Sequence, residues 1–251
     1  MGSSMLTRMF LAVALLAGAS LAVAQDKVIR LTSLEWPPYA GEAVDGQGAS
    51  VAVVRAAAEA MGYTLEVKFF PWSRAVAMAQ DPKSGFHGYF PEYSSEQVAT
   101  EFLLSDPIGT GPLGFVEQAA APVAWSSLAD LAGKPIGTVR DYVNTEEFDA
   151  KAAAGELKVD PVVDDLTNIK KVGAGRIPLA VIDKNVLNHM LQTEPALASV
   201  KDKVQFNARL LEDKKLYVAF QRSPEGEAAA KVINEGLGKI DIAAITSKYF
   251  K

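Results

Sequence analysis

The chain has 251 residues, and its 30 acidic and 25 basic side chains give a net charge of −5 at neutral pH. A mildly acidic chain without basic runs is a poor candidate for nucleic-acid binding, so we expect no such partner. The sequence contains no cysteine, which excludes disulfides, and its length suits one large domain or two lobes of about 100 residues each.

The first 24 residues are predicted to contain a secretory signal. Residues 1–4 resemble a cloning remnant, Arg8 then precedes an apolar run at Met9–Ala17, and Ala22-Val23-Ala24 forms a cleavage site before Gln25. An uncleaved N-terminal anchor is the alternative. No later segment is apolar over a membrane-spanning length. We therefore expect a soluble mature protein, residues 25–251, in a bacterial periplasm.

Strand-like and helical patterns alternate in the first half of the chain, which is typical of an α/β fold with crossover connections. The predicted strands are Val28–Thr32, Thr64–Phe70 and Gly88–Phe90. The predicted helices are Ala49–Met61, Arg74–Gln80 and a short one at Ser95–Thr100. Between the first strand and the first helix, Glu35-Trp36-Pro37-Pro38-Tyr39 places two aromatic rings and a carboxylate on a turn that two prolines stiffen.

The composition changes at Pro107–Gly114, which is rich in glycine and proline, and the alternation of strands and helices then restarts. The predicted extended segments are Gly114–Gln118, Pro135–Val139, Leu157–Val163, Leu179–Ile182, Val204–Ala208 and Lys215–Phe220. The predicted helices are Ser127–Leu131, Thr145–Ala153, Leu166–Ala174, Lys184–Leu191, Pro224–Leu237 and Ile242–Tyr249. A restart of the same pattern in mid-chain predicts two similar lobes.

Six short motifs follow one another along the whole chain. They are Trp36-Pro37-Pro38-Tyr39, Pro71-Trp72-Ser73-Arg74, Ser105-Asp106-Pro107-Ile108, Ser127-Leu128-Ala129-Asp130-Leu131-Ala132-Gly133-Lys134, Gly175-Arg176-Ile177 with Ala180-Val181-Ile182-Asp183, and Ser247-Lys248-Tyr249-Phe250. In this order they resemble the family 3 extracellular solute-binding proteins, the polar amino-acid type that serve ABC importers. The resemblance covers Val28 to Phe250.

The resemblance implies a type II periplasmic binding protein fold, in which two α/β lobes are joined by two crossing segments and enclose a ligand in the cleft between them. The first lobe would consist of residues 25–113 and 213–251, and the second of residues 114–212. The crossings would lie near Gly109–Gln118 and Asn207–Asp213. The family resemblance also implies a monomer that closes by a hinge motion and delivers a small molecule to the membrane subunits of an ABC importer.

The family's commonest pattern places an arginine that binds the ligand's carboxylate near the start of the helix after the third strand. The corresponding stretch here is Tyr93-Ser94-Ser95-Glu96-Gln97-Val98, which contains no arginine. Neither Gln97 nor Val98 can make the bidentate pairing that an arginine makes with a carboxylate. We therefore expect weak or no binding of ordinary L-α-amino acids.

Other groups are candidates for holding an anionic part of a ligand. Arg74 opens a helix on the expected side of the cleft, and Arg140 follows the strand Pro135–Val139 at the end where open α/β sheets bind ligands. Asn144 and Thr145 precede the next helix, where free backbone amides favour an anion. A surface ion pair is the alternative for each arginine, and plain helix capping is the alternative for the other two.

Carboxylates and aromatic rings complete the predicted site. Asp183 ends a buried strand and matches the family's aspartate that binds the ligand's amino group; capping of the next helix is its alternative role. Glu35 and Glu92 lie near the cleft on the first-lobe side, where they would favour a cationic or hydroxyl-rich ligand. The aromatic walls would come from Trp36, Tyr39, Trp72 and Tyr93.

The leading functional hypothesis is a periplasmic solute-binding protein for ABC import. The alternative is a dehydratase-like enzyme on the same scaffold, with Glu92 or Asp183 as general acid. No paired catalytic motif is visible, so we do not expect an enzyme. The two histidines, His87 and His189, fall in separate predicted lobes, and we expect neither a metal site nor a cofactor. A sensor module of a larger receptor is a less favoured third interpretation, because the chain ends at Lys251 without a linker.

Overall fold

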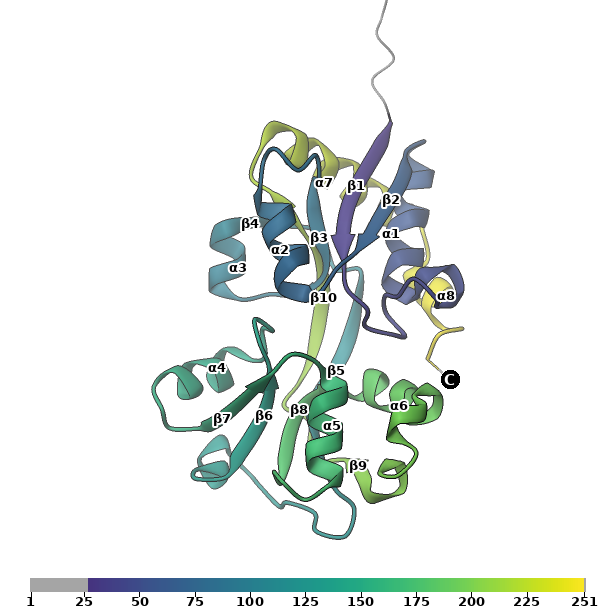
Figure 1. The fold of residues 1–251 in the computed structure, drawn as a ribbon. Helices are drawn as coiled ribbons and strands as arrows, with labels where there is room; N and C mark the ends of the chain where they lie inside the picture. The colour runs from purple at the N-terminus through teal and green to yellow at the C-terminus, as the bar shows by residue number, and fades with distance from the viewer. Residues whose placement is uncertain (1–26, 251) are drawn as a thin grey trace, which may run out of the picture.

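The computed structural model describes residues 27–250, so the predicted signal lies outside the described residues. The chain folds into two α/β lobes joined by two long strands, β5 (Gly109–Gln118) and β10 (Glu212–Gln221) (Figure 1). This confirms the predicted fold class. No helix among the described residues combines the length and the hydrophobicity that crossing a membrane requires.

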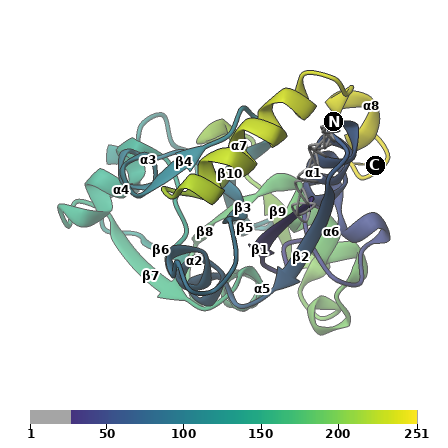
Figure 2. The ribbon, with the colours of Figure 1, turned by 90° about the horizontal axis from the view of Figure 1, so that it is seen from above.

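The first lobe is built around a mixed sheet. Its strands β1 (Val28–Ser33), β2 (Thr64–Phe69) and β3 (Gly88–Tyr93) are parallel, and β10 pairs with β3 in the antiparallel sense. The short β4 (Phe102–Leu104) also pairs with β10. The helices are α1 (Ala49–Ala60), α2 (Trp72–Gln80), α3 (Glu96–Glu101), α7 (Pro224–Leu237) and α8 (Ile242–Thr246). Figure 2 shows α7 and α2 on opposite sides of this part of the sheet.

The second lobe repeats this plan. Strand β6 (Pro135–Val139) lies between the parallel strands β7 (Lys158–Val162) and β8 (Leu179–Asp183). The helices are α4 (Glu146–Ala153), α5 (Asp165–Gly173) and α6 (Lys184–Thr193). A further strand, β9 (Val204–Phe206), pairs with the end of β5. The predicted helix at Ser127–Leu131 is a single 3₁₀ turn, Leu128–Leu131.

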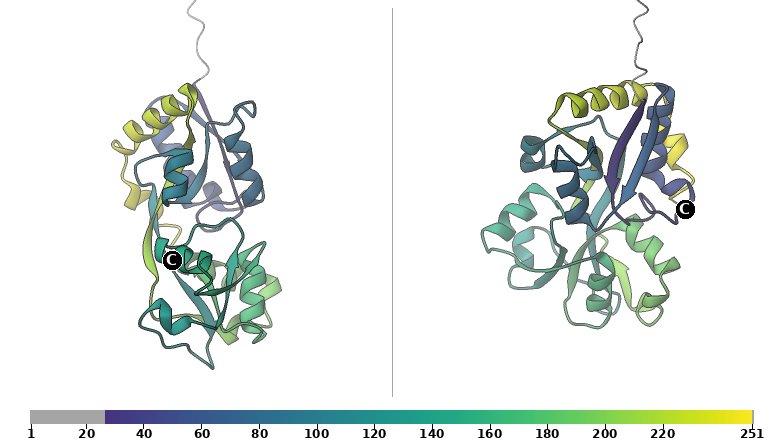
Figure 3. Two further views of the ribbon diagram at one scale, coloured as in Figure 1. Left: turned by 90° about the vertical axis from the view of Figure 1, so that its left-hand side faces the viewer. Right: turned by 45° about the horizontal axis from the view of Figure 1, so that its top comes forward.

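Each crossing strand divides its pairing between the two lobes. The first part of β5 pairs with the first part of β10, from Gly109 with Leu216 to Leu113 with Glu212. The rest of β5 pairs with β8, and the rest of β10 pairs with β3. The strands therefore form one hydrogen-bonded sheet path, β2-β1-β3-β10-β5-β8-β6-β7, although the lobes are distinct (Figure 3). A two-stranded ribbon twists easily, so this segment can act as the hinge.

The observed elements differ from the predicted ones mainly at their ends. Strand β3 continues through Pro91 to Tyr93 instead of ending at Phe90, and α8 ends at Thr246 instead of Tyr249. Strand β4 was not predicted, because three residues that directly follow a helix show no period of their own. Because the crossing strands pair with both lobes, the residue boundaries assigned to the lobes stay a prediction.

Close packing of α7 on α1 joins the C-terminal part of the chain to the first lobe. A Cβ at Gly236 would lie 2.0 Å from the carbonyl oxygen of Ala57, which is closer than real contacts allow. We expect Gly236→Ala to lower the free energy of unfolding by about 1–3 kcal/mol, because the helices must separate. Gly238→Ala is the matched control, because its Cβ would lie 3.6 Å from the backbone oxygen of Glu235, an ordinary contact distance. Urea denaturation measures both, and equal stabilities would contradict this packing.

Candidate functional site

Polar side chains from the two lobes meet at Asp183, the last residue of β8. Its carboxylate Oδ2 lies 3.1 Å from the Tyr39 hydroxyl and 3.4 Å from the Tyr93 hydroxyl, which both come from the first lobe. Its Oδ1 accepts hydrogen bonds from the backbone amides of Asn185 and Val186 and so caps α6. The predicted capping role and the predicted cleft position are therefore both found in one side chain, which is 2% exposed.

A second set of contacts joins α2 to the loop after β6. The indole of Trp72 donates to the carbonyl oxygen of Asp141 at 2.9 Å, and the Ser73 hydroxyl donates to the Asp141 carboxylate. Asp141 has a φ of 61°, a left-handed conformation that aspartate tolerates better than most residues. The Trp72 and Tyr142 rings meet edge to face at 5.8 Å. The lobes are therefore in contact, as expected for a closed arrangement.

The space that remains between these contacts is small. An inner cavity of about 20 Å³ lies between the lobes, which is about the volume that one water molecule needs. Its lining is mostly aromatic and apolar, and Glu92 is its carboxylate. The lining residues are Leu34, Trp36, Trp72, Pro91, Glu92, Tyr93, Tyr142, Val143 and Leu216. Four of the predicted site residues, Trp36, Trp72, Glu92 and Tyr93, are thus brought together.

Glu92 is buried on β3 and is held by neutral donors. Its oxygens accept hydrogen bonds from the Tyr89 hydroxyl at 2.9 Å and from the backbone amide of Tyr93 at 2.7 Å. Burial raises the pKa of Glu92 to about 8, although these two donors and the charge of Lys214 lower it. The glutamate is therefore expected to be largely protonated at pH 7 when the cleft is closed.

Asp165 is a buried carboxylate of the site that the sequence analysis missed. It begins α5 and is 6% exposed. Burial, and then the charge of Asp183, raise the pKa of Asp165 to about 7, while a hydrogen bond from the Trp36 side chain lowers it. Burial also raises the pKa of Asp183 to about 7, against the lowering effect of its amide and hydroxyl donors. The closed cleft therefore holds carboxylates whose charged forms are disfavoured.

A wide groove opens outward from Glu92 and is lined by residues of α2, α3 and α4. Figure 1 shows α2 and α3 in the first lobe, on the side that also carries α4 in the second lobe. Its volume is about 790 Å³. Six carboxylate residues line it, and its lining includes no lysine or arginine. They are Glu92, Glu96, Glu101, Asp141, Glu146 and Asp149. Because Glu92 and Tyr142 line both the groove and the inner cavity, the two spaces adjoin.

Lys214 on β10 is a second residue that the sequence analysis missed. It is 5% exposed, and its ammonium lies 3.4 Å from the carbonyl oxygen of Ser94 and 3.9 Å from the carboxylate of Glu212. The ammonium also lies 5.5 Å from the centre of the Tyr93 ring. The positive charge of this lysine is thus placed beside the cleft, outside the lining of the acidic groove.

Three predicted site residues have exposed side chains and line neither interlobe cavity. The Arg74 guanidinium lies 4.9 Å from the centre of the Phe70 ring. Arg140 is exposed, and its backbone amide bonds to Val162 in the neighbouring strand. The carboxylate of Glu35 accepts the backbone amide of Glu42 at 2.9 Å. The structure does not bring these three residues to the place where Glu92 and Asp183 lie.

Asn144 and Thr145 are buried before α4, and their side chains are used within that helix. Asn144 donates its backbone amide and its side-chain amide to the carboxylate of Asp149, at 2.8 and 2.7 Å. The Thr145 hydroxyl accepts the backbone amide of Phe148 and caps the helix. The capping alternative is thus found at these two positions.

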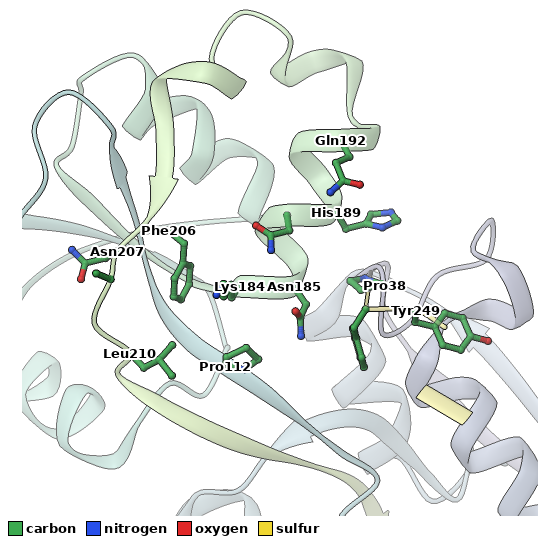
Figure 4. A pocket seen from close by; sticks show the side chains of 13 residues that line it. Pro38, Pro112, Lys184, Asn185, His189, Gln192, Phe206, Asn207, Leu210 and Tyr249 are labelled. Atoms are coloured by element: carbon green, nitrogen blue, oxygen red, sulfur yellow. The ribbon is translucent and has the colours of Figure 1, made fainter. Parts of the chain in front are cut away.

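A further cavity of about 730 Å³ lies away from the acidic groove, between α6 and the C-terminal segment (Figure 4). Amide side chains, one lysine, one histidine and aromatic rings line it, and its lining includes no carboxylate. The polar lining residues include Lys184, Asn185, Asn188, His189, Gln192 and Asn207. The cavities on the two sides of the crossing strands thus differ in their electrostatic character.

Comparisons with known proteins agree with the fold. No family model and no curated protein matches the chain. A histidine kinase sensor domain with similarity to periplasmic binding proteins matches with a TM-score of 0.75 and 20% identity, over 88% of this chain and 95% of its own. An ancestral arginine-binding protein bound to arginine matches with a TM-score of 0.72 and 18% identity, over 90% and 99%.

Two other solved structures widen the range of similar proteins. An amino-acid ABC transporter substrate-binding protein from Streptococcus pneumoniae, bound to L-arginine, has a TM-score of 0.69 and 15% identity, over 89% of this chain and 93% of its own. An ancestral amino-acid-binding protein, described as a precursor of cyclohexadienyl dehydratase, has a TM-score of 0.69 and 17% identity, over 90% and 96%. At these identities the likeness shows the two-lobe fold of periplasmic binding proteins.

Proposed function

We propose that this protein is a periplasmic solute-binding protein that closes its two lobes around a small polar molecule and delivers it to an ABC importer. The observation that carries the proposal is the meeting of Tyr39 and Tyr93 with Asp183, because it builds one buried polar site from both lobes. The hinge ribbon of β5 and β10 supplies the means of opening. The amino-acid-binding proteins among the similar structures support the same class of function.

Ligand-induced closure tests this proposal. We expect the radius of gyration, measured by small-angle X-ray scattering, to fall when the right small molecule is added to the purified protein, with a matching heat in calorimetry. A panel of amines, amino acids, small carboxylates and sugars covers the charge classes. Binding without a change in the scattering curve, or no response to any class, would contradict the proposal.

A dehydratase-like enzyme is the second candidate, and Glu92 is the observation that favours it. A carboxyl group with a pKa of about 8 is protonated at neutral pH and could act as a general acid. Solute binding is the stronger proposal, because dehydration also needs a substrate hydroxyl placed against this group. Incubation with a substrate of cyclohexadienyl dehydratase tests the enzymatic activity directly. Turnover that Glu92→Gln abolishes would favour the dehydratase-like enzyme. Absence of turnover would favour solute binding.

A further inference from the structure

We propose that the solute is an organic cation, an amine or guanidinium compound, and that it needs no carboxylate of its own to bind. This inference rests on the proposed function, since it concerns the same cleft. It names the class of molecule that the interlobe groove and the inner cavity would recognise together.

Both walls of the groove carry carboxylates. Glu96 and Glu101 come from the first lobe, and Glu146 and Asp149 come from the second. Closure brings these like charges together, which is unfavourable unless a positive charge lies between them. A cation in the groove would attract both walls, whereas an anion would be repelled by both. The groove therefore makes closure selective for a cation.

The hydrogen bonds made by these carboxylates do not neutralise them. Glu101 accepts from the side-chain amides of Gln80 and Gln97, at 2.8 and 3.0 Å. Asp149 likewise accepts from Asn144. All these donors are neutral, and the ion pairs found among residues 27–250 involve none of the groove carboxylates. The negative charge of the groove thus remains available to a ligand.

Buried carboxylates in the interior of the cleft point independently to a cation. Glu92, Asp165 and Asp183 are exposed by only 5%, 6% and 2%, and none of them belongs to an ion pair of the described residues. Buried carboxylates are normally paired or bound to a cation. The hydrogen bond that lowers the pKa of Asp165 comes from the Trp36 side chain, which is a neutral donor. Of the three, Glu92 lines both the groove and the inner cavity. An ammonium or guanidinium group at this inner end of the groove would pair with Glu92 and favour its ionised form.

Lys214 does not remove this requirement. Its charge lowers the pKa values of Glu92 and Asp149, yet both pKa values remain raised. Its ammonium contacts the Ser94 carbonyl oxygen and lies near Glu212 and the Tyr93 ring. One lysine cannot balance the carboxylates of both cavities.

Aromatic rings at the junction of the two spaces favour an organic cation over a metal ion. Tyr142 lines both the groove and the inner cavity, and Trp72 packs against it. The faces of such rings attract organic ammonium and guanidinium groups. The exposed positions of Arg74 and Arg140 leave the groove lining without an arginine to bind a ligand carboxylate. A cationic ligand therefore needs no carboxylate of its own to bind in the groove.

Matched probes test the inference by calorimetry and small-angle X-ray scattering. Putrescine is compared with 1,4-butanediol, which has the same chain length but no charge, and agmatine is compared with L-arginine, which adds a carboxylate. Succinate and calcium chloride complete the set. We expect putrescine or agmatine to bind and close the lobes, agmatine to bind at least as tightly as L-arginine, and neither butanediol nor succinate to bind.

Variants locate the cation. Glu92→Gln and Glu146→Gln each remove an ionisable carboxylate, from the inner and outer parts of the groove respectively, and we expect the first to weaken binding by about thirtyfold or more. Glu147→Gln is the control, because Glu147 belongs to the same turn of α4 but does not line the groove. Glu146→Gln keeps the test valid if the buried variant does not fold. A larger effect of Glu147→Gln than of Glu146→Gln would overturn the inference.

The outcomes separate this inference from the proposed function. If succinate or butanediol closes the lobes and neither putrescine nor agmatine does, the ligand is not an organic cation. The proposed solute-binding function would still hold. Binding of calcium in place of the organic cations also overturns it. No closure with a probe of any charge contradicts both.

Discussion

Acidification from about pH 8.5 to about pH 5.5 is expected to shift the ligand-free protein toward the closed arrangement of its lobes. In the closed cleft the pKa values of Asp165 and Asp183 are about 7, and that of Glu92 is about 8. In an open cleft these groups are hydrated and return toward their ordinary values near 4. The closed form therefore binds more protons, so its advantage is complete below the ordinary pKa values and is lost as the pH rises through 7 to 8.

Cation binding is expected to have the opposite pH dependence. Protons and a cationic ligand compete for Glu92, which lines the groove and has a pKa of about 8 in the closed cleft. The affinity for putrescine or agmatine should therefore fall by about tenfold or more over this pH range. Scattering measures the closure, and calorimetry at each pH measures the affinity. Asp165→Asn should flatten the closure curve, because it removes one of the groups whose pKa is raised in the closed cleft. An affinity that rises on acidification would contradict the inference that the ligand is a cation.

Replacement of Asp183 is expected to change stability in a direction that depends on the substituting residue. Asp183→Ala removes the cap of α6 and the acceptor for the Tyr39 and Tyr93 hydroxyls, so we expect the free energy of unfolding to fall by about 2–4 kcal/mol. Asp183→Asn keeps a capping oxygen and removes a buried charge. We expect this variant to be at least as stable as the parent protein at pH 8.

Urea denaturation at pH 8 and at pH 5 checks this comparison. The advantage of the asparagine variant should shrink at pH 5, where the aspartate is itself protonated, since its pKa is about 7. An alanine variant as stable as the parent protein would show that neither the cap nor the interlobe bonds contribute to folding.

Most of the fold could be predicted because hydrophobic periodicity marks its elements directly. The restart of the pattern after Pro107–Gly114 indicated two lobes, and the positions of Trp36, Tyr39 and Asp183 beside the cleft followed from motif order and strand ends. Side-chain direction in loops could not be predicted in the same way. Arg140 follows a strand at the expected end, yet its side chain is exposed beside the left-handed turn at Asp141.

The two missed residues had signals in the sequence. Lys214 is in phase with Leu216 and Val218, the buried side chains of a strand in which alternate residues face inward. Asp165 is in phase with Ile169 and Val172 on the buried face of α5. A charged residue in phase with a buried face indicates a paired or functional charge, and both residues lie beside the candidate site.

The division of pairing between β5 and β10 also sets the order in which the protein can be completed. Strands β6 to β9 follow β5 directly in the chain, so the second lobe has its partners once Phe206 has been made. The first lobe must wait, since β3 pairs with β10 between Tyr93 and Leu216, and α1 packs against the still later α7. At about 5–20 residues per second, synthesis from Tyr93 to its partner Leu216 takes on the order of ten seconds. A nascent chain that stops before β10 therefore holds a second lobe with its strands and a first lobe that lacks β10, the partner of β3 and β4.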